Sequence, residues 1–376
     1  SIWTTNVLSI LLLIILPFFV CLLLFISFLK TKVLFIAYSV GNIFRLVVGA
    51  GLVILGLGWI GAILGCISMS VMSLIILLAY SFNITRLRIL FDLKALRDVL
   101  SAGMARWFPR MITIVGQWLG VLTVFGISGA SETGHYYIAY AIASVVLIIA
   151  SSMLGLMLPV LSGMSDGRKR ASWRVIKISL VFMVPVAAFV EAYPWIPLGL
   201  LGEEYVSASI MLEILLLSCV PVALTSGVIS LIYAYGNYMQ VLGIGLAENI
   251  PRITLYYFLT KMYGGNGTAL SFTIGSLTGM LAALCVAHMV KFNINFKDLV
   301  TIVGPPFLVA LISSYIRLHW LIGGFLTITF SIITYTRLNV LTRSDLREVA
   351  YALAPEDIVQ KVYVKFKPLM DLLFET

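Results

Sequence analysis

Long stretches without charge constrain this sequence more than any other feature. A helix needs roughly 20 predominantly apolar residues to cross the hydrocarbon core of a bilayer, and the sequence contains eleven such stretches. Only 11% of its 376 residues are charged, whereas a soluble domain carries about 25%. A transmembrane β-barrel is excluded, because its strands alternate polar and apolar residues over segments of about ten. The sequence therefore predicts an all-α polytopic membrane protein. The eleven expected helices are 3–28, 33–56, 58–82, 101–128, 133–163, 173–199, 206–235, 238–262, 265–290, 298–316 and 319–337.

The net charge of +9 follows the membrane topology. When the chain is threaded through its eleven helices, most of the 25 lysines and arginines fall on one side. The opposite side has Lys261 and Arg317, together with the acidic pair Glu203 and Glu204. Positive loops stay in the cytoplasm, so we expect a multi-pass protein of the cell membrane with cytoplasmic basic loops and tail. No nucleic-acid partner is needed to explain the charge.

A weak internal repeat indicates how the helices are organised. NIFR at 42–45 matches NIPR at 249–252, and GAIL at 61–64 matches GTAL at 267–270. The helices before residue 83 then correspond to those from 206 to 290, and three helices at 101–199 have no counterpart in the first copy.

The same threading places Ser1 on the outer side of the membrane. An odd number of helices before Ser1 would return the start of the chain to the cytoplasmic side. We therefore expect two six-helix lobes related by a pseudo-two-fold axis along the membrane normal, the first lacking about three N-terminal helices. Two further helices follow the second lobe. The expected segments are an N-lobe remnant at 1–82, an amphipathic cytoplasmic linker at 83–100, a C-lobe at 101–290, two C-terminal helices at 291–337 and a basic amphipathic tail at 338–376.

Several motifs, in their order and spacing, give the chain a family resemblance. They are LRILFDLKALRDVLSAG (87–103), SETGHYYIAYAIAS (131–144), MLGLMLPVLSGM (153–164), LLGEEYVSAS (200–209) and YGGNGTALS (263–271). With the helix count, they resemble the MOP flippase superfamily, and within it the polysaccharide and lipid-linked oligosaccharide (O-antigen-type) flippases. The resemblance implies a transporter without a cofactor, not an enzyme. Many relatives carry an acidic residue in the seventh family helix, where IVGQWLGVL (114–122) has none.

Four arginines lie within the predicted spans: Arg45, Arg106, Arg110 and Arg252. Each costs about 2.5–3.5 kcal/mol at the centre of a helix, so such residues generally face a bundle interior or a water-filled cavity. Two alternatives stay open. Arg106 and Arg110 are close enough to the cytoplasmic end of their span to extend to lipid phosphates, and Arg252 is placed to pair with Glu248 four residues earlier.

These arginines suggest the substrate. Guanidinium groups match phosphate oxygens in geometry and stay charged, so the hypothesis is a cationic chamber that binds the phosphate of a polyprenyl- or dolichyl-linked oligosaccharide. The repeat asparagines Asn42 and Asn249 belong to this candidate site, and Glu248 is either an ion-coupling site for H⁺ or Na⁺ or a structural partner. Aromatic residues placed to stack on sugars, or simply to pack, are Trp107, Trp118, Tyr137, Tyr140, Tyr256 and Tyr257.

Three other functions compete with this hypothesis. A membrane-embedded glycan polymerase or glycosyltransferase would need catalytic residues, and no metal-ligand spacing, P-loop or nucleophile motif occurs. A cation-coupled multidrug exporter of the same superfamily would favour an anionic or aromatic chamber. A lipid scramblase or a structural partner is compatible with the sequence. The four cysteines lie in separate apolar spans and are expected to be reduced packing residues.

Overall fold

The computed structural model describes residues 31–84, 111–112, 114–343 and 345. The expected helix at 3–28, nearly all of the linker at 83–100, and the tail from residue 346 onwards lie outside the described residues. The chain divides into two compact units, Ser1–Leu96 and Arg97–Thr376. Each is described by itself below.

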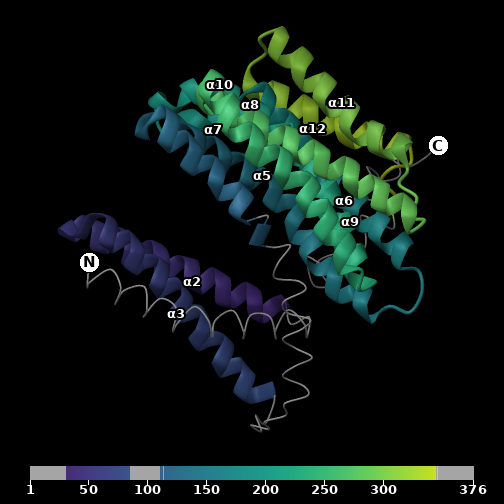
Figure 1. Ribbon diagram of the computed structural model, residues 1–376, viewed down its shortest axis with the longest axis horizontal. Helices are drawn as coiled ribbons and strands as arrows, with labels where there is room; N and C mark the ends of the chain where they lie inside the picture. Colours follow the sequence, from purple (N-terminus) through teal and green to yellow (C-terminus); the bar gives the residue numbers. More distant parts are fainter. Residues whose placement is uncertain (1–30, 85–110, 113, 344, 346–376) are drawn as a thin grey trace. The chain divides into compact units, whose positions relative to one another are not determined.

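The first unit contains a helical hairpin. Its helices are α2 (Thr31–Leu52) and α3 (Gly58–Ile84), joined by the π-helical turn η1 (Val53–Leu57) (Figure 1). Small residues let the two backbones approach closely, as is common between membrane helices. A Cβ on Gly65 would lie 2.6 Å from the Cα of Gly49, for example.

The second unit is a larger helical bundle in which every described segment of regular structure is helical. Its elements are the helix Ile114–Ser128, α5 (Ala130–Gly163), α6 (Arg168–Ala192), α7 (Trp195–Gly199), η2 (Glu203–Ala208), α8 (Ser209–Leu216), α9 (Cys219–Ala234), α10 (Tyr238–Met289), α11 (Phe296–Tyr315) and α12 (Trp320–Arg337).

Helix α6 lies at the centre of this bundle, and α5, α9, α11 and α12 all pack against it. Its apolar side chains are accordingly buried along most of its length. Glycines on the neighbouring helices provide the space. A Cβ on Gly227 of α9 would lie 2.3 Å from Cγ1 of Ile176, and one on Gly323 of α12 would lie 2.0 Å from the hydroxyl oxygen of Tyr193.

Helix α10 is two membrane-length helices joined at a sharp bend. Gly264 has φ 56° and ψ −137°, a backbone conformation that side chains rarely permit. The backbone N–H of the next residue, Gly265, donates a 2.8 Å hydrogen bond to the carboxylate of Glu132 in the first turn of α5. At the opposite end of α5, Arg168 donates to the carbonyl oxygens of Met164 (2.7 Å) and Ala234 (2.9 Å).

The hairpin of the first unit and the hairpin within α10 have the same turn. Gly58 has φ 51° and ψ −130°, close to the angles of Gly264. A Cβ on Gly61 would meet the backbone of Leu52 and Val53, while one on Gly267 would meet that of Leu259 and Thr260. These are corresponding positions of the sequence repeat. The first hairpin has one more residue than the second between its repeat arginine and this turn, and the wider π-helical turn η1 lies in that interval.

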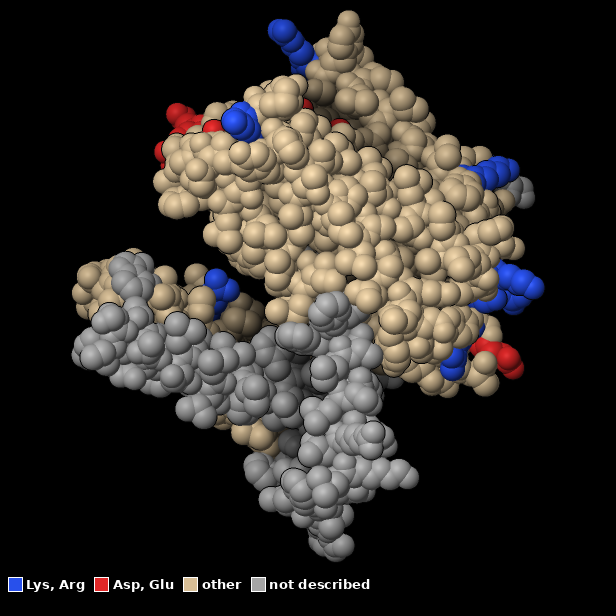
Figure 2. All heavy atoms as spheres, in the orientation of Figure 1, with Lys and Arg blue, Asp and Glu red and all other residues tan. Residues whose placement is uncertain are grey.

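The surface of the second unit suits a bilayer. Figure 2 shows a broad band without charged residues, with charged side chains gathered toward the two ends of the bundle. Among the described residues, seven helices are long and apolar enough to cross a membrane. This number differs from the eleven predicted stretches largely because α10 counts as one helix and 3–28 and much of 101–128 lie outside the described residues. The all-α, polytopic prediction is confirmed.

Candidate functional site: a buried arginine and an exposed arginine

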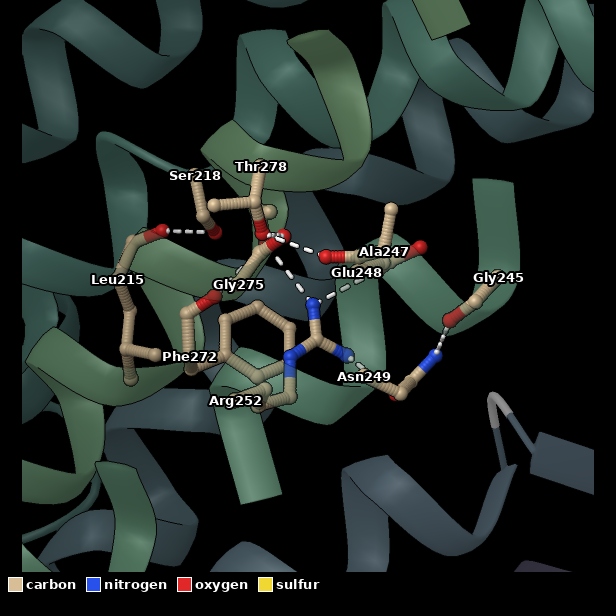
Figure 3. A network of polar contacts seen from close by, with 11 residues as sticks. Leu215, Ser218, Gly245, Ala247, Glu248, Asn249, Arg252, Phe272, Gly275 and Thr278 are labelled. Carbon is tan, nitrogen blue, oxygen red and sulfur yellow. Dashed lines mark hydrogen bonds and ion pairs between the residues drawn. The ribbon is translucent and has the colours of Figure 1, made fainter. Parts of the chain in front are cut away.

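Arg252 lies in the first half of α10 and is completely buried, with 0% of its surface exposed. Its Nη2 atom donates to Oε1 of Glu248 at 2.7 Å and to Oγ of Ser276 at 3.0 Å, and Nη1 donates to Oδ1 of Asn249 at 3.4 Å. The guanidinium carbon lies 4.2 Å from the ring centre of Phe272. The cation is therefore bound by a carboxylate, two neutral oxygens and an aromatic face, all within the second unit (Figure 3).

Glycines in the second half of α10 make room for this network. A Cβ on Gly275 would lie 2.6 Å from Cβ of Arg252, and one on Gly279 would lie 2.8 Å from Cβ of Glu248. The hydroxyl of Thr278, between them, donates to the carbonyl oxygens of Ala247 (2.8 Å) and Gly275 (2.9 Å). The two halves of α10 are thus joined by polar contacts that any larger residue at these glycines would displace.

The pair of Arg252 and Glu248 balances its charge internally. An isolated buried guanidinium would be very unfavourable, and an ion pair with further hydrogen bonds offsets much of that cost. In this arrangement Arg252 has the structural partner that its spacing from Glu248 predicted. Asn249 belongs to the same network and also donates to the carbonyl oxygen of Gly245 at 2.9 Å. A role for these residues in binding substrate stays a prediction.

Arg45 is at the corresponding position of the first hairpin, and its surroundings differ. Its side chain is exposed on α2, as is that of Asn42, which donates to the carbonyl oxygen of Tyr38 at 2.9 Å. The described residues of this hairpin, 31–84, contain no aspartate or glutamate. Neither α2 nor α3 therefore provides a carboxylate to neutralise Arg45.

The remaining site candidates are divided between exposed, buried and undescribed positions. Arg106, Arg110 and Trp107 lie outside the described residues. About half of the surface of Trp118, Tyr137 and Tyr257 is exposed, which leaves these rings accessible to lipid or to a ligand. Tyr256 is buried.

The sixth aromatic candidate, Tyr140, is part of the packing beneath Arg252. Its ring packs edge-on against Phe272, with ring centres 5.6 Å apart, and stacks on Tyr136 at 6.3 Å. The exposed rings thus remain candidates for sugar stacking, while Tyr140 and Tyr256 belong to the interior.

Two residues outside the predicted site have prominent roles in the structure. Glu132 accepts the hydrogen bond from Gly265, a residue 133 positions away, so no local pattern could have revealed the contact. Tyr136 is 1% exposed and lies beside Tyr256. Its position on the buried face of α5 was predictable from helical spacing, but its neighbours were not.

Within the described part of the chain, no group of three histidines, cysteines or carboxylates is placed to hold a metal ion. Cys66, Cys219 and Cys285 are free thiols, of which only Cys219 is buried. Cys21 lies outside the described residues.

Comparisons with known proteins agree with this architecture. A family model described as polysaccharide biosynthesis protein matches residues 2–210, more than half of the chain. The solved structures include a similar one, lipid II flippase MurJ in an inward closed conformation, with a TM-score of 0.61 and 16% sequence identity. That match covers 89% of this chain and 82% of the MurJ chain. No curated protein matches the sequence. The chain therefore has a MurJ-like, all-helical membrane fold, and it belongs to the polysaccharide biosynthesis protein family.

Proposed function

We propose that the protein is a flippase that moves lipid-diphosphate-linked oligosaccharide or polysaccharide precursors from the cytoplasmic to the outer leaflet by alternating access. Its family belongs to polysaccharide biosynthesis, and its fold is similar to that of a lipid II flippase. Transport needs no catalytic residue, so this function calls for a phosphate-binding group and a path for a polar glycan.

The observation that carries the proposal is the environment of Arg45. A charge on a membrane-spanning helix requires a partner or water, and the 31–84 hairpin provides no carboxylate. A lipid phosphate satisfies this requirement, because the guanidinium forms two parallel hydrogen bonds to phosphate oxygens. Arg106 and Arg110 remain part of the proposed phosphate site, together with Asn42.

Arg252 and Glu248 have a different role in this proposal. Their mutual ion pair stabilises the second hairpin, so we assign them a structural function and not a coupling site for H⁺ or Na⁺. The proposal places the protein in the cell membrane with its basic loops in the cytoplasm, as the positive-inside rule predicts.

The test is flipping of a lipid-linked oligosaccharide in reconstituted vesicles. Arg45→Ala should lower the flipping rate at least about tenfold, because it removes the guanidinium proposed to bind the phosphate, and Arg45→Lys should lower it less, because it keeps the charge but loses the bidentate geometry. Lys261→Ala is the matched control, since it removes one exposed positive charge elsewhere. Wild-type flipping by Arg45→Ala would exclude a phosphate-binding role for this residue.

A further inference from the structure

The helix Ile114–Ser128 contacts the rest of its unit through a face that includes two glycines. Gly116, Gly120 and Val124 recur at four-residue spacing and are buried. A Cβ on Gly116 would lie 2.0 Å from Oδ1 of Asn249. A Cβ on Gly120 would lie 3.0 Å from the hydroxyl oxygen of Tyr256 and 3.1 Å from that of Tyr136. We call this contact, formed by Gly116, Gly120, Asn249, Tyr136 and Tyr256, the glycine seam.

The two tyrosine hydroxyls of the glycine seam lack full hydrogen bonding. Tyr136 and Tyr256 are each 1% exposed, and among the described residues neither hydroxyl oxygen has a hydrogen-bond partner of normal geometry. The hydroxyls are near enough to interact with each other, but a bond between them would still leave one hydroxyl proton without an acceptor. A buried polar group left unsatisfied costs about 1–3 kcal/mol. The closed seam therefore carries an unfavourable contribution that its neighbours do not offset.

The glycines do not provide a normal hydrogen-bond partner for these hydroxyls. A glycine presents only Cα–H groups, which form weak hydrogen bonds at most. A small displacement of the helix Ile114–Ser128 away from α5 and α10 would admit water, and water satisfies a hydroxyl as both donor and acceptor. Opening the seam thus removes apolar contact, but it allows water to form the hydrogen bonds that the tyrosine hydroxyls lack in the closed seam.

We propose that the glycine seam is a conformational device that keeps the closed and open positions of the helix Ile114–Ser128 close in free energy. The inference rests on the proposed function, since alternating access requires two arrangements of similar stability. Tyr136 and Tyr256 are positioning residues in this device: their incompletely satisfied hydroxyls disfavour the closed seam, and Gly120 encloses them without offering a side-chain partner.

The experiment compares Tyr136→Phe, Tyr256→Phe and the double variant with Tyr335→Phe. Tyr335 is a matched control, because it is also 1% exposed but its hydroxyl donates to the carbonyl oxygen of Ile302 at 2.7 Å. The control should lower the Tm, since it removes a satisfied hydrogen bond. The seam variants should keep or raise the Tm and slow flipping on the order of tenfold, because they stabilise the closed seam.

A second measurement follows opening of the seam in the absence of substrate. Val124→Cys places a thiol on the same buried face, in a chain whose four native cysteines are replaced by alanine. Its labelling by a water-soluble thiol reagent should slow on the order of tenfold in the double phenylalanine variant and stay unchanged with Tyr335→Phe. Because labelling needs no lipid-linked glycan, it decides the seam proposal even if the protein flips another cargo.

Two results would overturn the proposal. A Tm that falls in the seam variants as it does in Tyr335→Phe would show that the hydroxyls are satisfied in the closed state. An unchanged labelling rate of Val124→Cys would show that they do not influence opening.

Discussion

The α2–α3 hairpin and the hairpin within α10 share their turn and differ in what surrounds their arginine. Gly58 and Gly264 have nearly the same backbone angles, and Gly61 and Gly267 abut corresponding backbone positions. In the α10 hairpin the arginine is enclosed and paired with a glutamate, whereas Arg45 is exposed in a hairpin without carboxylates. Both hairpins therefore share the glycines that form their turn, but within the described residues only the α10 hairpin provides polar partners for its arginine.

The contact between the two helices of each hairpin shows how this difference arises. In the first hairpin a Cβ on Gly41 would lie 2.3 Å from the hydroxyl oxygen of Ser73 on the opposite helix. At the corresponding repeat positions the second hairpin has Glu248 and Gly279, in close contact. The glycine is on the first helix and the polar residue on the second in the α2–α3 hairpin, and this order is reversed in the α10 hairpin. Only the second arrangement places a carboxylate one helical turn from the arginine, so only that arginine is neutralised locally.

The largest expected effect would test this difference directly. Arg252→Ala leaves Glu248 buried without its partner and should lower the free energy of unfolding by about 3–5 kcal/mol. Arg45→Ala removes an exposed side chain and should change it by no more than about 0.5 kcal/mol. The measurement is unfolding in detergent micelles, by heat or denaturant. Equal destabilisation by the two variants would mean that both hairpins use their arginine structurally.

A double variant serves as the control for that comparison. Glu248→Gln combined with Arg252→Gln removes both charges and should recover much of the stability that Arg252→Ala loses, because no unpaired buried charge remains. Flipping should also recover if the pair is structural. Recovery of stability without recovery of flipping would instead assign the pair to the substrate.

A smaller effect is expected at the glycines after the turn. Gly267→Ala would place a Cβ 1.9 Å from the carbonyl oxygen of Leu259, whereas in Gly61→Ala the nearest atoms are the Leu52 carbonyl carbon and the Val53 backbone nitrogen, both at 2.9 Å. We expect Gly267→Ala to destabilise by about 3 kcal/mol and Gly61→Ala by about 1 kcal/mol. Gly243→Ala is the control, since a Cβ there meets nothing within 4 Å. No loss of stability at either position would argue against the shared turn.

The smallest effect concerns one hydroxyl in each hairpin that donates to a backbone carbonyl of the opposite helix. Ser73 donates to the carbonyl oxygen of Ala37 at 3.0 Å, and Thr278 donates to that of Ala247 at 2.8 Å. Ser73→Ala and Thr278→Val should each lower the free energy of unfolding by about 0.5–1.5 kcal/mol. Similar losses would show that the two hairpins gain comparable stability from these bonds. A loss confined to Thr278→Val would show that only the hairpin containing the ion pair depends on them.

The sequence was sufficient to predict the helices, because a span depends on local apolar content. It also indicated the correspondence between Arg45 and Arg252, since both follow an asparagine by three residues in matching motifs. The ion pair of Arg252 with Glu248 was one of two alternatives that helical spacing allowed. Spacing along one helix shows which residues can meet, but it does not show whether a second helix encloses them.

Contacts between distant segments were not predictable from one sequence. The bond between Glu132 and Gly265 depends on the turn of α10 lying next to the start of α5, and neither residue has a neighbouring pattern that indicates the other. The sequence places a glycine-rich turn between the spans 238–262 and 265–290, but it does not specify the backbone conformation of the bend at Gly264. The closeness of Tyr136 and Tyr256 to Gly120 depends on the packing of three helices, which single-helix periodicity does not determine.

The carboxylate of Glu132 also has a mechanical consequence. It fixes the bend of α10 to one end of α5, and Arg168 fixes the neighbouring chain segments at the other end. Helix α5 is therefore tied to other segments of the second unit at both of its ends, so a displacement of the bend of α10 should also move α5. The helix Ile114–Ser128 meets the same two helices through glycines, which contribute no interlocking side chain, so this helix should move relative to α5 and α10 more readily than they move relative to each other.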